Sequence, residues 1–301
     1  MVNRLNFAGL WLPLVTPMAA TPQRTVDHAA LARLVQHLAA QGVAGFVACG
    51  STGEAAMLSP DEQTAVLATT LAAAGGKPVL MGLSGVVAQA VGERAQALAQ
   101  AQPAVAGFLL TAPGYVKPSQ AGIVQHFHQV AEASPRPLVA YDIPARTGVR
   151  IEPATLLALA DHPRIQAVKD CSADRAAAQA VLADGRLALL AGNDDELFDQ
   201  LARGAVGAIT ASAHLATAAF VRLHQWLADQ QLRAAQALWR RLQPVTAAAF
   251  AEPNPVVIKA ALAQQGWLTD AVRPPMLPAA PASAQALLQA EAVALAAVGG
   301  L

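Results

Sequence analysis

The sequence predicts a (β/α)₈ barrel, an α/β fold, followed by a C-terminal helical extension. Short apolar runs alternate with longer amphipathic stretches, and this alternation recurs at intervals of about 25–30 residues. Strand–helix alternation favours a parallel sheet with right-handed crossovers. Eight such repeats fit a closed barrel better than an open, doubly wound sheet. After about residue 213 the pattern becomes entirely helical, which predicts the extension.

The expected strands are eight apolar runs of five or six residues, at 10–15, 45–50, 78–83, 107–111, 137–142, 165–170, 187–192 and 206–210. Between them, helices are expected where a capping Ser, Thr or Asp, or a first-turn Pro, precedes an amphipathic stretch. These helices are at 28–41, 60–74, 119–133, 154–161 and 195–203. A Rossmann-like sheet ranks second, because "GSTGE" (50–54) lacks the G-x-G-x-x-G spacing of that fold.

The C-terminal part predicts four more helices, and a Pro-rich linker at 273–282 precedes the last of them. They are expected at 214–229, 231–250, 255–265 and 281–297. We therefore expect two parts, a catalytic barrel over 1–213 and a helical extension over 214–301.

Composition excludes several classes of protein. The 301 residues carry a formal net charge of zero, so nothing points to nucleic acid or to an anionic membrane. No apolar run approaches the roughly eighteen residues of a membrane span, and "MVNRLNFAGLW" does not resemble a secretory signal. Two cysteines, Cys49 and Cys171, make no disulfide framework, so a cytoplasmic protein is expected. No metal is expected, since His126 and His128 lie two apart on a predicted helix and do not share a face.

Lys169 is the most informative residue, because it follows the largely apolar run Ile165–Val168 in a chain with only four lysines. Barrel enzymes carry their active sites at the carboxyl ends of the strands. Lys77 precedes a strand, Lys117 lies in a solvated loop and Lys259 lies on the C-terminal helices. A buried ammonium is costly unless it is paired or loses its proton. Lys169 is therefore either an ion-pair partner, for example of Asp170, or an amine that can form a Schiff base with a ketone.

Other strand ends on the same rim supply possible partners. "GSTGE" offers the hydroxyls of Ser51 and Thr52 and backbone N–H groups that can hold a carboxylate, although a plain glycine turn would look similar. "YDIPARTG" (141–148) provides Tyr141, either a proton carrier or a packing residue, and Arg146, which can clamp a carboxylate. The second tyrosine, Tyr115, also falls in a loop on this rim.

These motifs together resemble one family. "GSTGE", "YDIPARTG", "VKD" and "EPNPVVIK" (252–259), in this order and spacing, resemble the dihydrodipicolinate synthase/N-acetylneuraminate lyase family. The resemblance extends from "LVTPM" (14–18) to "RPPM" (273–276), nearly the whole chain. It implies a (β/α)₈ barrel with a C-terminal helical extension, the chemistry of pyruvate-dependent class I aldolases and a homotetramer built as a dimer of dimers.

The resemblance also implies four catalytic residues. Lys169 matches the lysine that forms the Schiff base, and Tyr141 matches the tyrosine that moves protons to and from bound pyruvate. Ser51 matches the relay hydroxyl. Tyr115 matches the tyrosine that, in the synthase, reaches across a dimer interface into the neighbouring site.

The substrate-binding residues implied by the resemblance are Thr52 and Gly53, for the pyruvate carboxylate, together with Ile209 and Arg146. The synthases carry "P-S/A-R-T-G" and use this arginine for the carboxylate of aspartate semialdehyde, whereas the sialic acid lyases resemble "P-A-L-S-G". "PARTG" here favours condensation of pyruvate with L-aspartate semialdehyde to 4-hydroxy-tetrahydrodipicolinate, in lysine biosynthesis. No cofactor is expected, because the lysine itself is the electron sink.

Two alternatives stay open. One is a pyruvate-dependent aldolase or dehydratase for a sugar acid or another 2-keto acid, and the other is a non-catalytic barrel that binds a keto acid. Gly114 and Val116 depart from the synthase pattern, which has an aromatic residue and an asparagine there, and Gly114 leaves the second-substrate side roomier. The stretches 55–63 and 84–91, which match the lysine-binding cleft of inhibited members, are nearly apolar, so weak or absent inhibition by lysine is expected.

Overall fold

A computed structural model describes residues 4–296 of the chain. Eight parallel strands form a closed barrel and follow one another around it in sequence order, which confirms the predicted fold class. Each strand overlaps one of the predicted apolar runs. The strands are β1 (Gly9–Pro13), β2 (Gly45–Ala48), β3 (Val79–Leu83), β4 (Gly107–Thr111), β5 (Leu138–Asp142), β6 (Ile165–Asp170), β7 (Ala188–Ala191) and β8 (Gly207–Ile209).

The helices at the nine predicted positions are α1 (His28–Ala40), α2 (Pro60–Ala73), α4 (Gln120–Ala133), α6 (Pro153–Leu159), α8 (Leu197–Ala202), α9 (Thr217–Ala228), α10 (Leu232–Ala249), α11 (Val256–Gln264) and α12 (Pro281–Ala296). The expected end of the last helix, at 297, lies outside the described residues. Three further helices had no predicted start: α3 (Ala88–Ala101), α5 (Pro144–Thr147) and α7 (Arg175–Asp184). At the start of α3, Val87 makes no side-chain cap, so the sequence carries no polar signal there.

Contacts divide the chain into two compact units. The β3–β8 unit comprises the N-terminal residues through Ala8 together with Pro78–Ile209. The β1–β2 unit comprises Gly9–Lys77 together with the chain from Thr210 onward, and so includes the C-terminal helices. The predicted division of the sequence between 213 and 214 remains a prediction.

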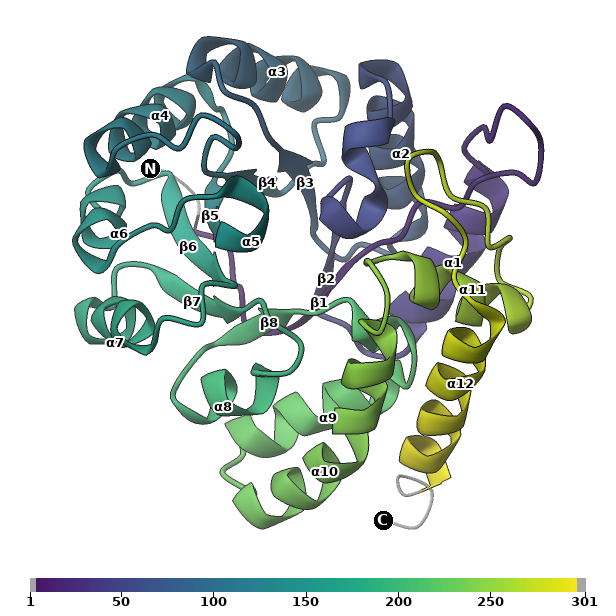
Figure 1. Cartoon of the computed structure of the whole chain (residues 1–301). Coiled ribbons are helices and arrows are strands. Elements are labelled where there is room, and N and C mark those ends of the chain that lie inside the picture. Colours follow the sequence, from purple (N-terminus) through teal and green to yellow (C-terminus); the bar gives the residue numbers. More distant parts are fainter. Residues whose placement is uncertain (1–3, 297–301) are drawn as a thin grey trace. The chain divides into compact units, whose positions relative to one another are not determined.

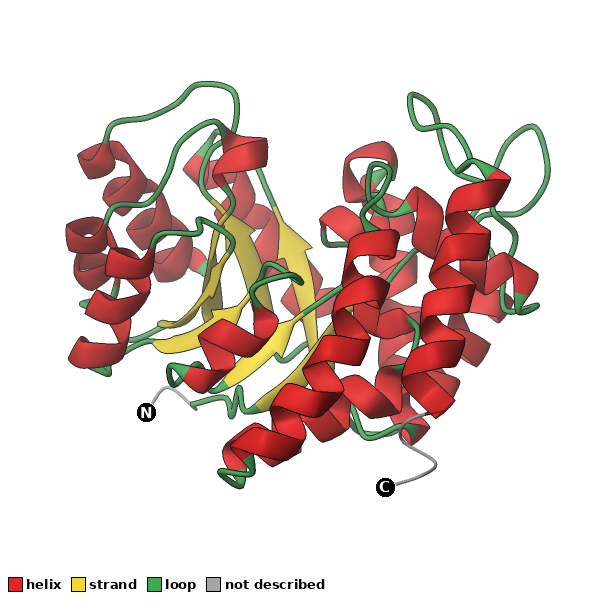
Figure 2. Ribbon diagram, turned by 60° about the horizontal axis from the view of Figure 1, so that its bottom comes forward, coloured by secondary structure: helices red, strands yellow, loops and turns green. Residues whose placement is uncertain are grey.

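In the β3–β8 unit, the strands lie side by side and α3, α4, α6 and α7 follow one another along their outer side (Figures 1 and 2). Every residue of β5 and of β6 is buried, as expected for parallel strands covered on both faces. Consecutive strand residues point to opposite faces, so polar residues in β5 and β6 lie either in the barrel interior or under the helices. A polar side chain there needs a partner.

In the β1–β2 unit, β1 pairs with β2, and α10 packs against both α9 and α12. Gly9 has a positive φ of 102°, and a side-chain carbon there would approach the Cβ of Ala44 to 2.7 Å, so only glycine fits. The buried residues of α10 recur with helical spacing and give it one apolar face, directed at its neighbours. Across residues 4–296, no helix combines the length and the apolar character that crossing a bilayer requires.

Candidate active site

Lys169 and Tyr141 lie side by side at the carboxyl ends of β6 and β5. The two residues are in register in the parallel pair, so their side chains project from the same face of the sheet. The ammonium nitrogen of Lys169 donates a hydrogen bond of 3.3 Å to the phenol oxygen of Tyr141 and lies 4.3 Å from the centre of its ring. Each residue is only 5% exposed. The structure thus brings together the two residues that are predicted to have the central catalytic roles.

The alternative interpretation of Lys169 as an ion-pair partner of Asp170 does not fit this geometry. Asp170 occupies the next position of the strand and therefore faces the opposite side of the sheet. One of its carboxylate oxygens accepts hydrogen bonds from the amide (2.8 Å) and the hydroxyl (2.6 Å) of Ser172. Within residues 4–296, Lys169 forms no ion pair with a carboxylate. The geometry favours the reactive amine.

The proton affinity of Lys169 depends on its neighbours as well as on burial. Burial, the largest influence, lowers the pKa of Lys169, but the anionic forms of Tyr141 and Cys171 raise it, and the net direction is upward. Burial also raises the pKa of Tyr141 and takes that of Cys171 to about 12. Because their pKa values are raised, Tyr141 and Cys171 are protonated near neutral pH. Two influences on the pKa of Lys169 then remain: burial, which lowers it, and the charge of Asp194, which raises it. The protonation states of the lysine, the phenol and the thiol therefore influence one another.

Cys171 is a member of this site to which the sequence analysis gave no role. It follows Lys169 by two residues, and its thiol lies close enough to the phenol of Tyr141 for each group to influence the pKa of the other. Its backbone N–H donates 2.8 Å to the carbonyl of Asp142, which continues the pairing of β6 with β5. A side-chain carbon at Gly192 would come within 2.4 Å of the sulfur, so glycine at this position makes room for the thiol.

Asp142, next to Tyr141, carries a buried carboxyl group on the other face of the sheet. The residue is 1% exposed, one oxygen accepts a hydrogen bond of 3.1 Å from the amide of Ile151, and the other oxygen has no partner within residues 4–296. The pKa of Asp142 is raised to about 7, mainly by burial. The hydrogen bond from Ile151 lowers this pKa, whereas the negative charge of Asp170 raises it. The hydrogen bond from Ile151 ties the far end of the segment that carries Arg146 back to the end of β5.

Arg146 and Tyr115 lie at the solvent-facing edge of the β3–β8 unit. Arg146 is exposed, on the single turn of α5, and its guanidinium has no side-chain partner in the described part of the chain. Gly148 ends that turn with φ 74°, and a side chain there would approach Lys117 to 3.0 Å. Tyr115 is 96% exposed, with a φ of 69°. Both side chains are available to a ligand or to another protein surface.

Ile209 ends β8 and is fully buried. It supplies apolar surface at the carboxyl end of its strand. No group of three or more His, Cys, Asp or Glu side chains within residues 4–296 is arranged to hold a metal ion.

The residues Ser51–Gly53 form a short 3₁₀ turn after β2, in the β1–β2 unit. Cys49 (φ 52°) and Glu54 (φ 57°) bracket the turn in the left-handed region, which is unfavourable for residues other than glycine. The amide of Gly53 donates 3.0 Å to the carbonyl of Gly50, so it is already used within the turn. The amides of Ser51 and Thr52 have no partner in the described residues, and they remain available to an anion.

Gly53 is needed for close packing. A side-chain carbon at this position would lie 3.0 Å from the carbonyl oxygen of Leu14 and 3.4 Å from the hydroxyl of Thr16. The Thr16 hydroxyl in turn donates 2.7 Å to the carbonyl of Gly53. The turn is thereby held against the segment that follows β1.

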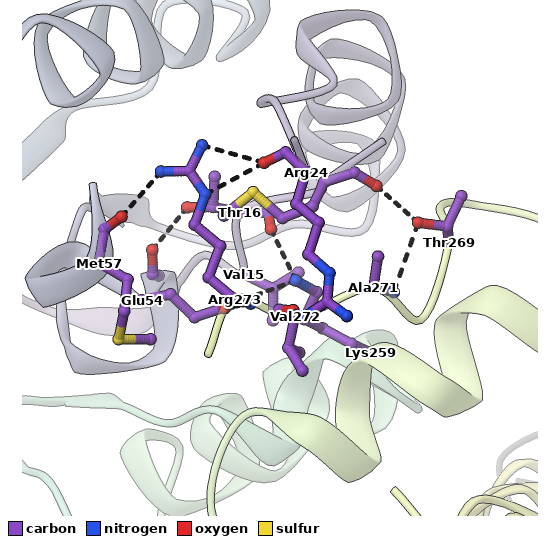
Figure 3. Close-up of polar contacts among 12 residues, drawn as sticks. Val15, Thr16, Arg24, Glu54, Met57, Lys259, Thr269, Ala271, Val272 and Arg273 are labelled. Carbon is purple, nitrogen blue, oxygen red and sulfur yellow. Dashed lines mark hydrogen bonds and ion pairs between the residues drawn. The ribbon is translucent and has the colours of Figure 1, made fainter. Parts of the chain in front are cut away.

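A buried ion pair connects the turn to the C-terminal helices. Lys259, on α11, donates 2.5 Å to the carboxylate of Glu54 and 3.0 Å to the carbonyl of Thr16, and the side chains of both Lys259 and Glu54 are fully buried (Figure 3). Burial lowers the pKa of Lys259, and the charge of Glu54 opposes this effect. From the sequence, Lys259 is expected on these helices and has no predicted role. No local pattern could have shown its partner, because Glu54 lies 205 residues away.

Arg273 extends this network from the Pro-rich segment. Its backbone N–H donates 3.2 Å to the other oxygen of Glu54, and its guanidinium donates to the carbonyls of Met57 and Arg24 (Figure 3). The same guanidinium forms an ion pair of 2.5 Å with Glu62, whose pKa this contact lowers to about 2. The segment around 273 is thus an anchored strap and not a free linker.

A comparison with known families identifies the chain. A (β/α)₈ barrel that carries a buried lysine beside a tyrosine at the carboxyl ends of its strands fits the class of barrel enzymes. The model of the dihydrodipicolinate synthetase family matches residues 6–293. The chain belongs to this family and is an enzyme, a lyase of the dihydrodipicolinate synthase type.

The relatives and solved structures that the chain resembles agree with this. A 4-hydroxy-tetrahydrodipicolinate synthase of Synechococcus sp. (strain WH7803) is 37% identical over 286 residues, 93% of each chain. The pyruvate-bound, chloride-inhibited dihydrodipicolinate synthase of Acinetobacter baumannii superposes with a TM-score of 0.90 at 30% identity, over 96% of this chain and 99% of that one. The enzyme of Thermotoga maritima superposes equally well, with a TM-score of 0.90 at 27% identity, over 96% of this chain and 98% of that one.

We predict that Lys259→Met destabilises the protein by about 3–5 kcal/mol, because it leaves the Glu54 carboxylate buried without a cation. The measurement is the free energy of unfolding in urea. The same change at Lys77, which has no ion pair within residues 4–296, serves as the control. Adding Glu54→Gln to Lys259→Met should recover part of the loss. Additive losses in the double variant would contradict the proposed coupling.

A second prediction concerns Asp142, whose raised pKa makes its ionised form unfavourable in the folded protein. The protonated carboxyl contributes stability that is complete below its ordinary pKa of about 4 and is lost as the pH rises to about 7. Asp142→Asn should therefore stabilise the protein at pH 8, by on the order of 3 kcal/mol. Thermal unfolding of both proteins at pH 4.5 and pH 8 measures the difference. An equal effect at the two pH values would contradict the prediction.

Proposed function

We propose that this lyase is a 4-hydroxy-tetrahydrodipicolinate synthase, which condenses pyruvate with L-aspartate semialdehyde through a Schiff base on Lys169. The observation that carries the proposal is the desolvated amine of Lys169, 3.3 Å from a phenol at the carboxyl end of adjacent strands. The relatives named as this synthase, at 37% and 34% identity, support the choice of reaction.

In the proposed reaction, Lys169 loses a proton and its amine attacks the ketone carbon of pyruvate. Tyr141 assists the departure of the ketone oxygen as water, which leaves an iminium. Loss of a methyl proton then gives an enamine, whose carbon attacks the aldehyde of the second substrate. Because the phenol contacts the lysine nitrogen directly, one group can serve in each of these proton transfers. Ser51 and Tyr115 carry protons onward in this proposal.

Two groups of residues hold the substrate carboxylates in this proposal. Thr52 and the unpaired amides of Ser51 and Thr52 bind the carboxylate of pyruvate, with Gly53 keeping the turn closely packed. Ile209 covers apolar surface of the substrate. Arg146, exposed and without a side-chain partner in the described residues, binds the carboxylate of aspartate semialdehyde.

One observation favours a second candidate. Gly114 stands where many synthases have an aromatic residue, and the nearest atoms to a side-chain carbon there would be 3.9 Å away. A side chain would fit at this position and its absence leaves more room, so an aldolase or dehydratase acting on a sugar acid is the alternative. The keto-acid-binding barrel without activity is not favoured, because the chain is an enzyme of this family.

We also propose a cytoplasmic homotetramer, built as a dimer of dimers. The near-complete exposure of Tyr115 supports an interface at this position, since a tyrosine gains most from burying its ring while its hydroxyl finds a partner. One structural neighbour, by contrast, is a variant described as the first monomeric dihydrodipicolinate synthase. Weak or absent feedback by lysine remains a prediction, and the exposed Val86 and Val87 in the corresponding stretch offer a charged ligand no polar side chain.

We predict that sodium borohydride traps pyruvate on the protein as a reduced adduct, and that mass spectrometry of the peptides assigns the added mass to Lys169. Lys169→Ala should abolish the adduct and reduce the turnover of pyruvate by at least about a thousandfold, since the nucleophile is removed. Lys117→Ala, in a solvated loop of the same unit, is the control and should be labelled normally. An adduct that persists in Lys169→Ala would refute the assignment.

A further prediction separates the two substrates. Pyruvate turnover with aspartate semialdehyde, coupled to a downstream reductase, should exceed turnover with sugar-acid aldehydes. Arg146→Ala should raise the KM for aspartate semialdehyde by roughly tenfold to a hundredfold, as expected for the loss of a charge-assisted hydrogen bond. The KM for pyruvate should stay within about twofold in the same variant. Faster turnover with a sugar-acid aldehyde would favour the alternative function.

A further inference from the structure

Asn254, in the C-terminal part of the β1–β2 unit, contacts the turn that carries Thr52. Its side-chain amide nitrogen donates a hydrogen bond of 2.9 Å to the hydroxyl oxygen of Thr52. The Asn254 amide oxygen is buried and has no partner within residues 4–296. Thr52 itself is only 4% exposed. The contact is thus a shielded, one-directional hydrogen bond between two residues that lie 202 positions apart.

This bond determines which role the Thr52 hydroxyl can play. A hydroxyl group has one hydrogen to donate and lone pairs that accept. Because the Asn254 amide nitrogen is a donor, it occupies a lone pair and cannot take the hydrogen. That hydrogen therefore remains for another acceptor, and a carboxylate oxygen is the strongest acceptor among the proposed ligands. In the described part of the chain, the hydroxyl of Thr52 donates to no other group.

The surroundings keep Asn254 in this position. The buried pair of Lys259 and Glu54 connects α11 to the residue that follows the turn, and Asn254 lies five residues before Lys259 on the same segment. Arg273 holds the second oxygen of Glu54 through its backbone N–H, at 3.2 Å. The Lys259–Glu54 pair thus fastens the segment that carries Asn254 to the end of the turn that carries Thr52, and Arg273 holds the same carboxylate from a different segment.

We propose that Asn254 is a positioning residue for substrate binding, which fixes the Thr52 hydroxyl as a donor to the carboxylate of a 2-keto acid. This inference rests on the proposed function and assigns a role to the segment before α11. Asn254 acts through Thr52 and does not contact the substrate. Its effect falls on the recognition of negative charge, not on the formation of the Schiff base.

The test compares an anionic with a neutral ligand. Borohydride trapping on Lys169 is titrated with pyruvate and with methyl pyruvate, an ester that has no carboxylate. Asn254→Ala should raise the half-saturating pyruvate concentration about tenfold. The half-saturating concentration of methyl pyruvate and the limiting extent of labelling should stay within about twofold of the wild type.

Asn254→Asp provides the sharper variant, because it keeps the shape of the side chain and replaces a donor with an acceptor. The aspartate would take the Thr52 hydrogen, so the half-saturating pyruvate concentration should rise at least as far as in Asn254→Ala. Glu252→Ala, which removes a different contact of the same segment, to the amide of Ala280, is the control and should bind both ligands normally.

Three outcomes would overturn the inference. The first is a wild-type affinity for pyruvate in Asn254→Asp, and the second is an equal weakening of pyruvate and methyl pyruvate in Asn254→Ala, which indicates general disruption. The third is an equal effect of Glu252→Ala and Asn254→Ala. Failure of the proposed function is distinct from all three, because the wild-type protein would then form no adduct with pyruvate.

Discussion

The contact between Lys169 and Tyr141 lies where β5 and β6 are buried along their whole length. Strands covered on both faces exclude water, so a lysine at their end can find only the groups that the fold supplies. The register of the pair supplies a phenol and a thiol, and it turns the carboxylate of Asp170 to the other face. The chemistry of the site follows from this arrangement.

The alternation of side chains along β5 and β6 also places two different sets of titratable groups on opposite faces of the sheet. On one face, Lys169, Tyr141 and Cys171 lie close enough to shift one another's pKa values. On the other face, Asp142 and Asp170 are acceptors for the backbone of the loops that follow the strands. A one-residue shift in the pairing of β5 with β6 would exchange the two sets. The strand register is therefore a requirement of the active site as much as of the core.

The sequence predicted the barrel, its eight strands and the lysine at the end of β6, because each of these leaves a local signal. Apolar runs mark strands, and a charged residue at the end of such a run is conspicuous. It did not predict α3, which lacks a polar cap at Val87. It also gave no role to Cys171, since a thiol resembles any small apolar residue until its neighbour across the strands is known.

The contacts of the C-terminal segment were beyond local patterns for a different reason. Lys259 and Asn254 meet the turn after β2 across more than 200 residues of chain, and no spacing rule connects such positions. The apolar stretch around Lys259 predicts a helix, and in the structure this lysine is fully buried. Only the three-dimensional structure shows that α11 contacts the end of the turn that follows β2.

The long separation of Glu54 and Lys259 along the sequence affects when the turn after β2 can form during translation. During translation, Glu54 leaves the ribosome 205 residues before Lys259, so the nascent chain holds that carboxylate without its cation until α11 has been made. Because an unpaired buried charge is strongly unfavourable, the turn cannot settle into its final form earlier. Completion of this turn therefore depends on a helix that is translated more than 200 residues later.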